Sequence, residues 1–189
     1  MKSTIHIILF VLAAATALMC CTKDRLENIK YLGDHATSTD TSGNVVINEF
    51  IATGSTHVNE YGFATDWIEL YNTGDKDLDF SMANHYITDD SSRPDKFSIN
   101  KLVIPAKGFI VVFCDDSAKI ATQVHTNFGL SKEGEYIGLY RKDGSGKWIQ
   151  LSGYRYGPQS SGRSEGRLPD GGLTWTSFSV PTPGNTNKF

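Results

Sequence analysis

The chain has 189 residues, of which 39% are hydrophobic and 11% aromatic, which is enough to bury one core without disulfide bonds. Lysine and arginine together number 18 and aspartate and glutamate 21, so the net charge is -3 at pH 7. This balance does not favour binding through the neutralisation of phosphates, and we expect no nucleic-acid partner.

The N-terminus resembles a bacterial lipoprotein signal. Lys2 precedes an apolar run over residues 5–19, which ends on two cysteines and is short for a membrane span. Cleavage of such a signal leaves an acylated N-terminal cysteine. We predict that this residue is Cys21, because Leu18 stands three residues before it, with Cys20 as the second choice. An ordinary secreted protein or an uncleaved signal anchor are the alternatives.

Three segments follow from this pattern. Residues 1–20 are predicted to be the lipoprotein signal peptide, and residues 21–44 a polar, flexible tether rich in Thr, Ser, Asp and Gly. Residues 45–189 are predicted to form one domain. A lipid anchor on Cys21 would hold this domain at the cell envelope, in a bacterium at the outer membrane. The leaflet that it faces stays open.

The domain begins with an apolar strand pattern at residues 45–52. A two-residue period places Val46 and Phe50 on one face and Ile47 and Ile51 on the other, so both faces are largely apolar. We therefore expect a strand that is covered on both sides.

The next strand pattern is Asp66–Asn72, after a loop at residues 53–65 that is long enough to hold a site. Its aromatic and β-branched composition favours a strand, and turn residues close it. Alternation divides its side chains into two sets: Trp67, Glu69 and Tyr71 against Ile68 and Leu70.

Short strand patterns then continue to the end of the chain. Phe109–Cys114 is apolar on both faces and predicts a central, buried strand, whereas residues 115–124 are looser and predict a helical turn. Other predicted strands lie at residues 78–80, 85–88, 97–99, 102–105, 136–140, 148–151 and 175–178. Many short strands with turn signals between them predict an all-β fold, a β-sandwich.

The order of these motifs resembles the lamin tail domain family over about residues 45–187. The matching stretches are 47–50 (INEF), 66–72 (DWIELYN), 78–89, 104–109 (IPAKGF), 128–139, 164–171 (SEGRLPDG), Trp175 and 181–185 (PTPGN). The resemblance implies an immunoglobulin-like β-sandwich. Without a coiled-coil rod, the chain looks like the bacterial members, which occur in secreted and envelope proteins.

A serine hydrolase site is the first catalytic possibility, because Gly162–Gly166 matches the pattern G-x-S-x-G. In that class a histidine base follows the serine along the chain. No histidine follows Ser164, and no apolar strand leads into the motif. We interpret the segment as a Gly-Ser turn.

A calcium site is the next possibility, because Asp75–Asp79 has the carboxylate spacing that opens a calcium-binding loop. Phe80 and Tyr86 stand where such a loop needs glycine and glutamate. We therefore expect no metal and no cofactor, and leave open a weak calcium ion held by loop carboxylates.

Cys114 is the one cysteine outside the N-terminal pair. Alternation groups it with Ile110 and Val112, which predicts a buried and inert thiol. A nucleophilic role would need a histidine partner, for which His85 or His125 stays open.

Carbohydrate chemistry is a further alternative, in which an accessory domain or enzyme acts through loop carboxylates. Glu49 and Glu69 lie on successive strands and would meet if these strands pair. Both glutamates, however, lie within the motifs that carry the resemblance to the lamin tail domain family, which implies that they are part of the fold. We therefore interpret them as structural.

Aromatic side chains are the remaining candidates for contacts with a ligand. Tyr61 and Phe63, and Tyr154 and Tyr156, are the best candidates for exposed ligand contacts, because glycine or charge flanks each pair. We predict a non-catalytic binding, adhesion or interaction module with a protein or glycan partner. A nucleic-acid-binding module is the remaining alternative, and the acidic balance counts against it.

Overall fold

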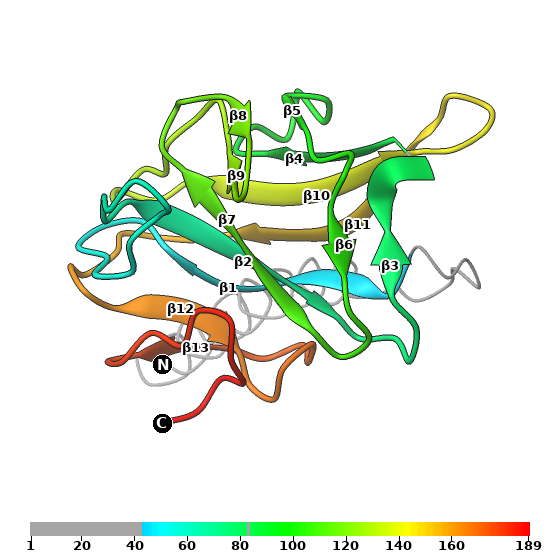
Figure 1. Ribbon diagram of the computed structural model, residues 1–189. Helices are drawn as coiled ribbons and strands as arrows, with labels where there is room; N and C mark the ends of the chain where they lie inside the picture. Colours follow the sequence, from blue (N-terminus) through cyan, green and yellow to red (C-terminus); the bar gives the residue numbers. More distant parts are fainter. Residues whose placement is uncertain (1–42, 83) are drawn as a thin grey trace, which may run out of the picture. The chain divides into compact units, whose positions relative to one another are not determined.

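A computed structural model of the chain describes residues 43–82 and 84–189. These residues form a large and a small sheet (Figure 1), with antiparallel neighbours except for the parallel pair β7 and β9. In the large sheet the order is β13 (Trp175–Phe178), β12 (Ser164–Arg167), β1 (Val45–Ile51), β2 (Asp66–Asn72), β7 (Phe109–Cys114), β9 (Val124–His125) and β8 (Lys119–Ile120). In the small sheet it is β11 (Trp148–Arg155), β10 (Tyr136–Lys142), β4 (His85–Thr88) and β5 (Phe97–Ser98).

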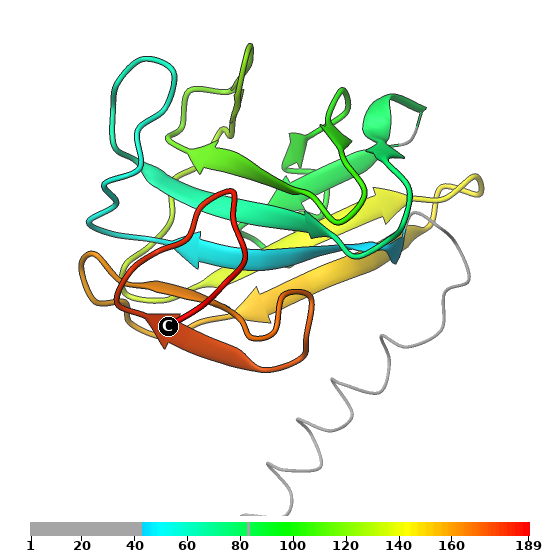
Figure 2. The ribbon, with the colours of Figure 1, turned by 60° about the horizontal axis from the view of Figure 1, so that its bottom comes forward.

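A two-stranded ladder completes the domain. It pairs β3 (Leu78–Asp79) with β6 (Val103–Ile104), and the short 3-10 helix η2 (Phe80–Met82) follows β3 directly. Figure 2 shows the strands from below, with the segment after β13 crossing over the large sheet. The predicted all-β fold is therefore confirmed.

The predicted N-terminal features fall outside this part of the chain. The signal peptide (1–20), most of the tether (21–44) and both lipidation candidates, Cys20 and Cys21, lie outside the described residues. Within residues 43–82 and 84–189, no helix has the length and hydrophobicity that a bilayer span requires.

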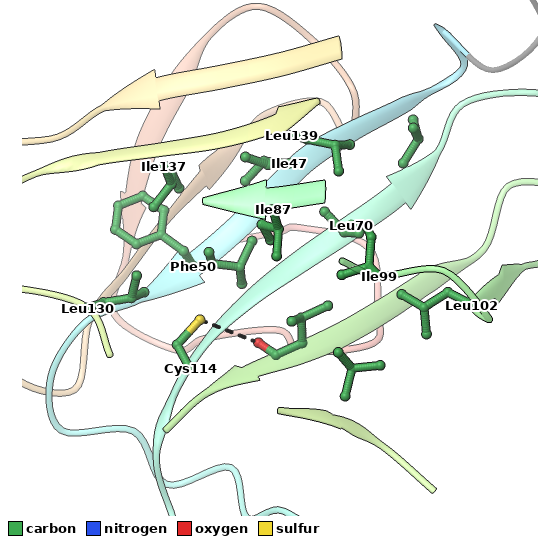
Figure 3. Packing of buried hydrophobic residues seen from close by; sticks show 14 of the residues in the cluster. Ile47, Phe50, Leu70, Ile87, Ile99, Leu102, Cys114, Leu130, Ile137 and Leu139 are labelled. Carbon is green, nitrogen blue, oxygen red and sulfur yellow. Dashed lines mark hydrogen bonds between the residues drawn. The ribbon is translucent and has the colours of Figure 1, made fainter. Parts of the chain in front are cut away.

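The hydrophobic core lies between the two sheets. Figure 3 shows side chains of both sheets meeting in one layer, with Phe50 and Leu70 from the large sheet and Ile87, Ile137 and Leu139 from the small one. Each of these five side chains is fully buried. Burying one such side chain contributes about 2 kcal/mol to the free energy of folding, so this layer dominates the stability of the domain.

β2 forms as the sequence predicts, at the centre of the large sheet between β1 and β7. Ile68 and Leu70 enter the main core, whereas Trp67 faces the other side of the sheet and packs with Ile51 and Phe113 in a second, smaller cluster. Both faces of β2 are therefore buried.

The facing predicted for β1 is wrong in its second half. The register runs from Ile47 opposite Leu70 to Glu49 opposite Glu69, so Asn48 is an extra residue in a β-bulge. A bulge shifts the alternation by one residue. As a result Ile47 and Phe50 both face the main core, while Ile51 faces the smaller cluster.

The predicted Gly-Ser turn at residues 162–166 is right only at its start, where Gly162 lies in a turn. From Ser164 on the segment is strand β12, which pairs with β1 through Glu49 opposite Gly166. A Cβ atom at position 166 would lie 2.9 Å from the carbonyl oxygen of Asn48. Glycine is therefore what lets the two backbones approach, and the sequence pattern gave no sign of this pairing.

The helical turn predicted at residues 115–124 is also absent, and the short strands β8 and β9 stand there. Asp116 and Ala118 both have a positive φ, of 59° and 55°, which a helix does not allow. β9 pairs with β7, and Val124 is buried in the core.

Candidate functional site

A groove of about 540 Å³ opens at one end of the large sheet. One wall is the loop between β1 and β2, and the other is the segment that leads from Asp115 into β8; both lie toward the left in Figure 1. Its lining residues are Asn59, Tyr61, Phe63, Thr65, Asp115, Ser117 and Lys119. β1 runs toward this end of the sheet, so the groove lies opposite the point where β1 starts.

Two of the predicted ligand contacts, Tyr61 and Phe63, lie at this groove. Tyr61 is 51% exposed and Phe63 is 66% exposed, so the expected exposure of both rings is confirmed. Whether they bind a ligand stays a prediction. Val58 and Ile120, one from each wall segment, are exposed as well, which gives this end of the domain an apolar surface.

The loop that carries the two rings is fixed by Asn59, which is only 5% exposed. Its Oδ1 accepts the backbone N–H groups of Tyr61 at 3.0 Å and Phe63 at 3.1 Å. Gly62 between them has a φ of 81°, which closes the turn in a conformation that glycine adopts freely. The aromatic side chains therefore project from a turn whose backbone hydrogen bonds are satisfied internally.

The floor below this loop is the small cluster on the outer face of the large sheet. The ring of His57 stacks on that of Phe113, with centroids 5.6 Å apart and planes within 7°. The indole N–H of Trp67 donates to Ser55 Oγ at 3.1 Å. Burial lowers the pKa of His57, which favours the neutral ring in this position.

The two walls meet through His125 of β9, whose side chain is fully buried. Its Nδ1 lies 2.7 Å from Asp115 Oδ2, and its Nε2 lies 2.9 Å from Glu60 Oε2. Burial alone would lower the pKa of His125, but the hydrogen bonds and charges of these two carboxylates outweigh it and hold the pKa above its ordinary value. We call this set the Glu60–His125–Asp115 cluster.

Further polar contacts join the same walls. Gln123 Oε1 accepts the backbone N–H of Glu60 at 2.8 Å, and the backbone N–H of Gln123 donates to Glu60 Oε1 at 3.3 Å. The Lys119 ammonium lies 5.5 Å from the centroid of the Tyr61 ring, a cation–π contact across the groove. The shape of the groove therefore depends on side chains of both walls.

The other predicted pair, Tyr154 and Tyr156, does not line the groove. Tyr156 is only 4% exposed, so its expected exposure is wrong: its ring packs 4.5 Å from that of Phe50 and its hydroxyl donates to Glu135. Tyr154 is half-buried, and its ring stacks on Trp175 at 3.9 Å. Tyr154 lies near the end of β11 and Tyr156 just beyond it, and both side chains turn toward the rest of the domain rather than toward solvent.

The carboxylates Glu49 and Glu69 do meet, as cross-strand neighbours, and both are fully buried. Glu49 accepts hydrogen bonds from Ser164 Oγ at 2.5 Å and from the backbone and hydroxyl of Thr182. Glu69 accepts from Asn48 Nδ2 at 3.0 Å and from the backbone N–H of Gly184 at 2.6 Å.

This carboxylate pair thus holds the segment after β13 against the sheet. Burial raises the pKa of both groups, and the negative charge of Asp170 adds to the rise in each. At Glu69 the charge of Glu49 adds further, and the pKa reaches about 8. Ser164 of the G-x-S-x-G motif is fully buried and serves as a donor to Glu49.

Cys114 is buried in the main core, where burial raises the pKa of its thiol far above the ordinary value. This confirms the buried position predicted for it and disfavours the reactive thiolate. In the described part of the chain, no three His, Cys, Asp or Glu side chains gather in a way that suits a metal ion.

A family model for the Lamin Tail Domain matches residues 38–160. The chain belongs to this family. The match spans β1, β2 and both walls of the groove, which confirms the resemblance and, with it, the immunoglobulin-like sandwich of this lamin tail domain. The closing motifs of residues 164–185 lie beyond the matched range, although β12 and β13 complete the large sheet. A comparison with curated proteins finds no match.

The Glu60–His125–Asp115 cluster could not be found from the sequence. Glu60 lies more than 50 residues from the other two members, and no local spacing links the three. One signal was available: Asn59 three residues before Gly62 is turn chemistry, which points to an ordered tip in the 53–65 loop.

Proposed function

We propose that this lamin tail domain is a non-catalytic binding module that holds a glycan in the groove and is anchored to the cell envelope by lipid on Cys21. The observation that carries the glycan proposal is the pair of exposed rings, Tyr61 and Phe63, on a loop with an internally fixed backbone. A preformed site binds with little loss of conformational entropy.

The size and chemistry of the groove support a saccharide. Its volume of about 540 Å³ is in the range of small-ligand sites, whereas a protein partner usually needs a much larger contact surface. The flat C–H faces of a sugar ring can pack on aromatic rings such as Tyr61 and Phe63. The hydroxyls of Thr65 and Ser117 and the ammonium of Lys119 stand beside them to meet the sugar hydroxyls.

A non-catalytic role is supported by the carboxylates. Glu49 and Glu69 are the two groups that could have acted as an acid–base pair, and both already accept hydrogen bonds from the segment that covers them. At the groove, Asp115 is engaged by His125 and Asn59. In a glycosidase the two catalytic carboxylates are free to contact the substrate, whereas each of these carboxylates is hydrogen-bonded to another part of the domain.

The location at the outer membrane rests on the N-terminal pattern. Residues 1–20 have the plan of a lipoprotein signal, and Cys21 is the proposed site of acylation. Residues 21–44 would then link the lipid to the start of β1.

The test is a glycan array probed with the full-length protein, solubilised in detergent, as wild type and as Tyr61→Ala and Phe63→Ala. We expect the wild type to bind a small set of related glycans and each variant to lose at least about fivefold in affinity, since one stacked ring contributes about 1–3 kcal/mol.

Leu173→Ala is the matched control, because Leu173 is 76% exposed and does not line the groove. It should bind like the wild type. If no glycan is bound while a protein array gives a partner whose binding needs Tyr61, the glycan assignment is wrong. If both ring variants bind as well as the wild type, the groove is not the site.

A further inference from the structure

The two walls of the groove are tied together through one buried ring. His125 reaches Glu60 on the β1–β2 loop with one nitrogen and Asp115 after β7 with the other, at 2.9 Å and 2.7 Å. Glu60 immediately precedes Tyr61, and the Tyr61 ring itself lies 5.6 Å from that of His125. The position of an exposed aromatic ring is thus linked directly to a titratable side chain.

A count of protons shows what this geometry requires. A carboxylate only accepts hydrogen bonds, so both ring nitrogens must donate if both contacts are to form. Only the doubly protonated imidazolium has two N–H groups. The neutral ring would turn a lone pair toward one carboxylate and lose that contact.

The charged groups around the ring come from three segments. The β1–β2 loop contributes Glu60, the segment after β7 contributes Asp115, and β8 contributes Lys119, the register partner of His125. β7 presents the uncharged ring of Phe113, whose centroid is 5.6 Å from that of His125. Two carboxylates therefore face the ring directly, while the Lys119 ammonium is directed over the Tyr61 ring.

We propose that His125 is a positioning residue for the groove, and that its positive charge holds the β1–β2 loop, with Tyr61, in the arrangement that binds the ligand. We call the contact between the His125 imidazolium and the two carboxylates the latch. This deepens the proposed function, on which it rests for the identity of the ligand. Of the two contacts, the one to Glu60 is the contact that opens, because Asp115 has two further donors, Asn59 and the backbone of Ser117. The Glu60 carboxylate has one further donor, the backbone N–H of Gln123.

The pH range of the latch follows from the direction of each shift. The pKa of His125 is raised, so the latch is closed below the ordinary histidine value and opens as the pH rises through the raised one. For Glu60 and Asp115, burial works against ionisation, but hydrogen bonds and charge from His125 lower the pKa of both. The latch therefore also opens in acid, below the ordinary carboxyl range. Between these limits the groove is held in shape.

The test is hydrogen–deuterium exchange of the full-length protein, followed by mass spectrometry over residues 56–63 from about pH 6 to about pH 10, across the range in which a raised histidine titrates. After correction for the intrinsic exchange rate, protection there should fall about tenfold, the effect of losing one hydrogen bond to a charged group. Residues 136–142 of β10 report global unfolding, which the ionisation of Glu69 makes easier over the same pH range, so the step at residues 56–63 is read as the difference between the wild type and the variant Glu60→Gln.

Glu60→Gln separates positioning from mere packing. A neutral amide can pair with a neutral imidazole as donor or acceptor, so this variant should keep its protection unchanged across the same pH range. Glu133→Gln, on an exposed loop elsewhere, should keep the wild-type profile.

Two results would overturn the latch: a wild-type profile without the step, or a Glu60→Gln variant that keeps the full step. The wild-type profile decides the question alone if Glu60→Gln fails to fold. The exchange measurement needs no ligand, so a glycan array without hits refutes the proposed function and leaves the latch to be judged by its own profile.

Discussion

Replacing Glu69 by glutamine should reverse the sign of its effect on stability between acid and alkaline pH. Glu69 is fully buried in β2, where its two oxygens accept hydrogen bonds from Asn48 and from the backbone of Gly184. Burial, the charge of Glu49 and that of Asp170 together raise its pKa from 4.5 to about 8. The ionised form is therefore unfavourable in the folded state.

The magnitude follows from linkage. A raised carboxyl pKa leaves stability intact below the unfolded value of 4.5 and reduces it as the pH rises toward about 8. Each pH unit in this window costs about 1.4 kcal/mol, so the wild type loses about 3 kcal/mol by pH 7. Other carboxyl groups titrate too, and for this reason the difference between variant and wild type is the informative quantity.

Glutamine removes this cost but brings one of its own. Its amide nitrogen replaces one accepting oxygen and leaves a donor of Asn48 or Gly184 unmatched, at about 2 kcal/mol. We therefore expect Glu69→Gln to be about 1 kcal/mol less stable than the wild type at pH 5 and about 2 kcal/mol more stable at pH 8. The two stability curves should cross between these values.

Urea unfolding, followed by tryptophan fluorescence at constant ionic strength across this range, gives the free energy at each pH. Glu133→Gln is the control, because the Glu133 side chain is 77% exposed, and its curve should run parallel to that of the wild type. Parallel curves for Glu69→Gln as well would show that Glu69 is not held near pKa 8 and would refute the reasoning.

Two further predictions concern other parts of the chain. Gly54→Ala and Gly62→Ala both force alanine into a positive φ, at a cost of about 1 kcal/mol each. Gly54→Ala should lower the free energy of unfolding in urea by more than Gly62→Ala does. The added Cβ at position 54 would lie 2.6 Å from the Gly162 nitrogen, whereas at Gly62 no atom is within 4 Å. Equal losses would contradict the close approach. Metabolic labelling with palmitate should disappear in Cys21→Ala and persist in Cys20→Ala. If both variants are labelled, Cys21 is not the lipidated residue.

Local pattern was sufficient for the parts of the fold in which one segment decides its own structure. β2 could be predicted to the residue because alternation, composition and a closing turn agree over Asp66–Asn72. The buried position of Cys114 followed from the same alternation in β7. In both cases the neighbouring strands only reinforced what the segment favoured.

The rest depended on neighbours far away in the chain. The bulge at Asn48 becomes visible only when β1 is set against β2, and β12 forms because Gly166 can approach β1 from more than 100 residues away. The burial of Tyr156 has the same origin, since Phe50 and Glu135 complete its environment. No pattern within one strand contains this information.

The candidate site divides in the same way. Tyr61 and Phe63 could be proposed from flanking residues, because exposure at a glycine-containing loop tip is a local property. The cluster that fixes the loop could not, because His125, Glu60 and Asp115 meet only after β7 and β9 have paired in parallel. A long-range pairing therefore decides which side chains form the groove.

The central claim, that the groove of this lamin tail domain holds a glycan, is tested most directly by mapping the bound sugar. The measurement is NMR chemical-shift perturbation of the full-length protein in detergent, titrated with the best-binding glycan of the array. We predict that the largest shifts fall on Tyr61, Phe63 and Lys119, and that they vanish in Tyr61→Ala. Shifts centred on Tyr86 and Trp148, which pack together on the small sheet, would contradict the account.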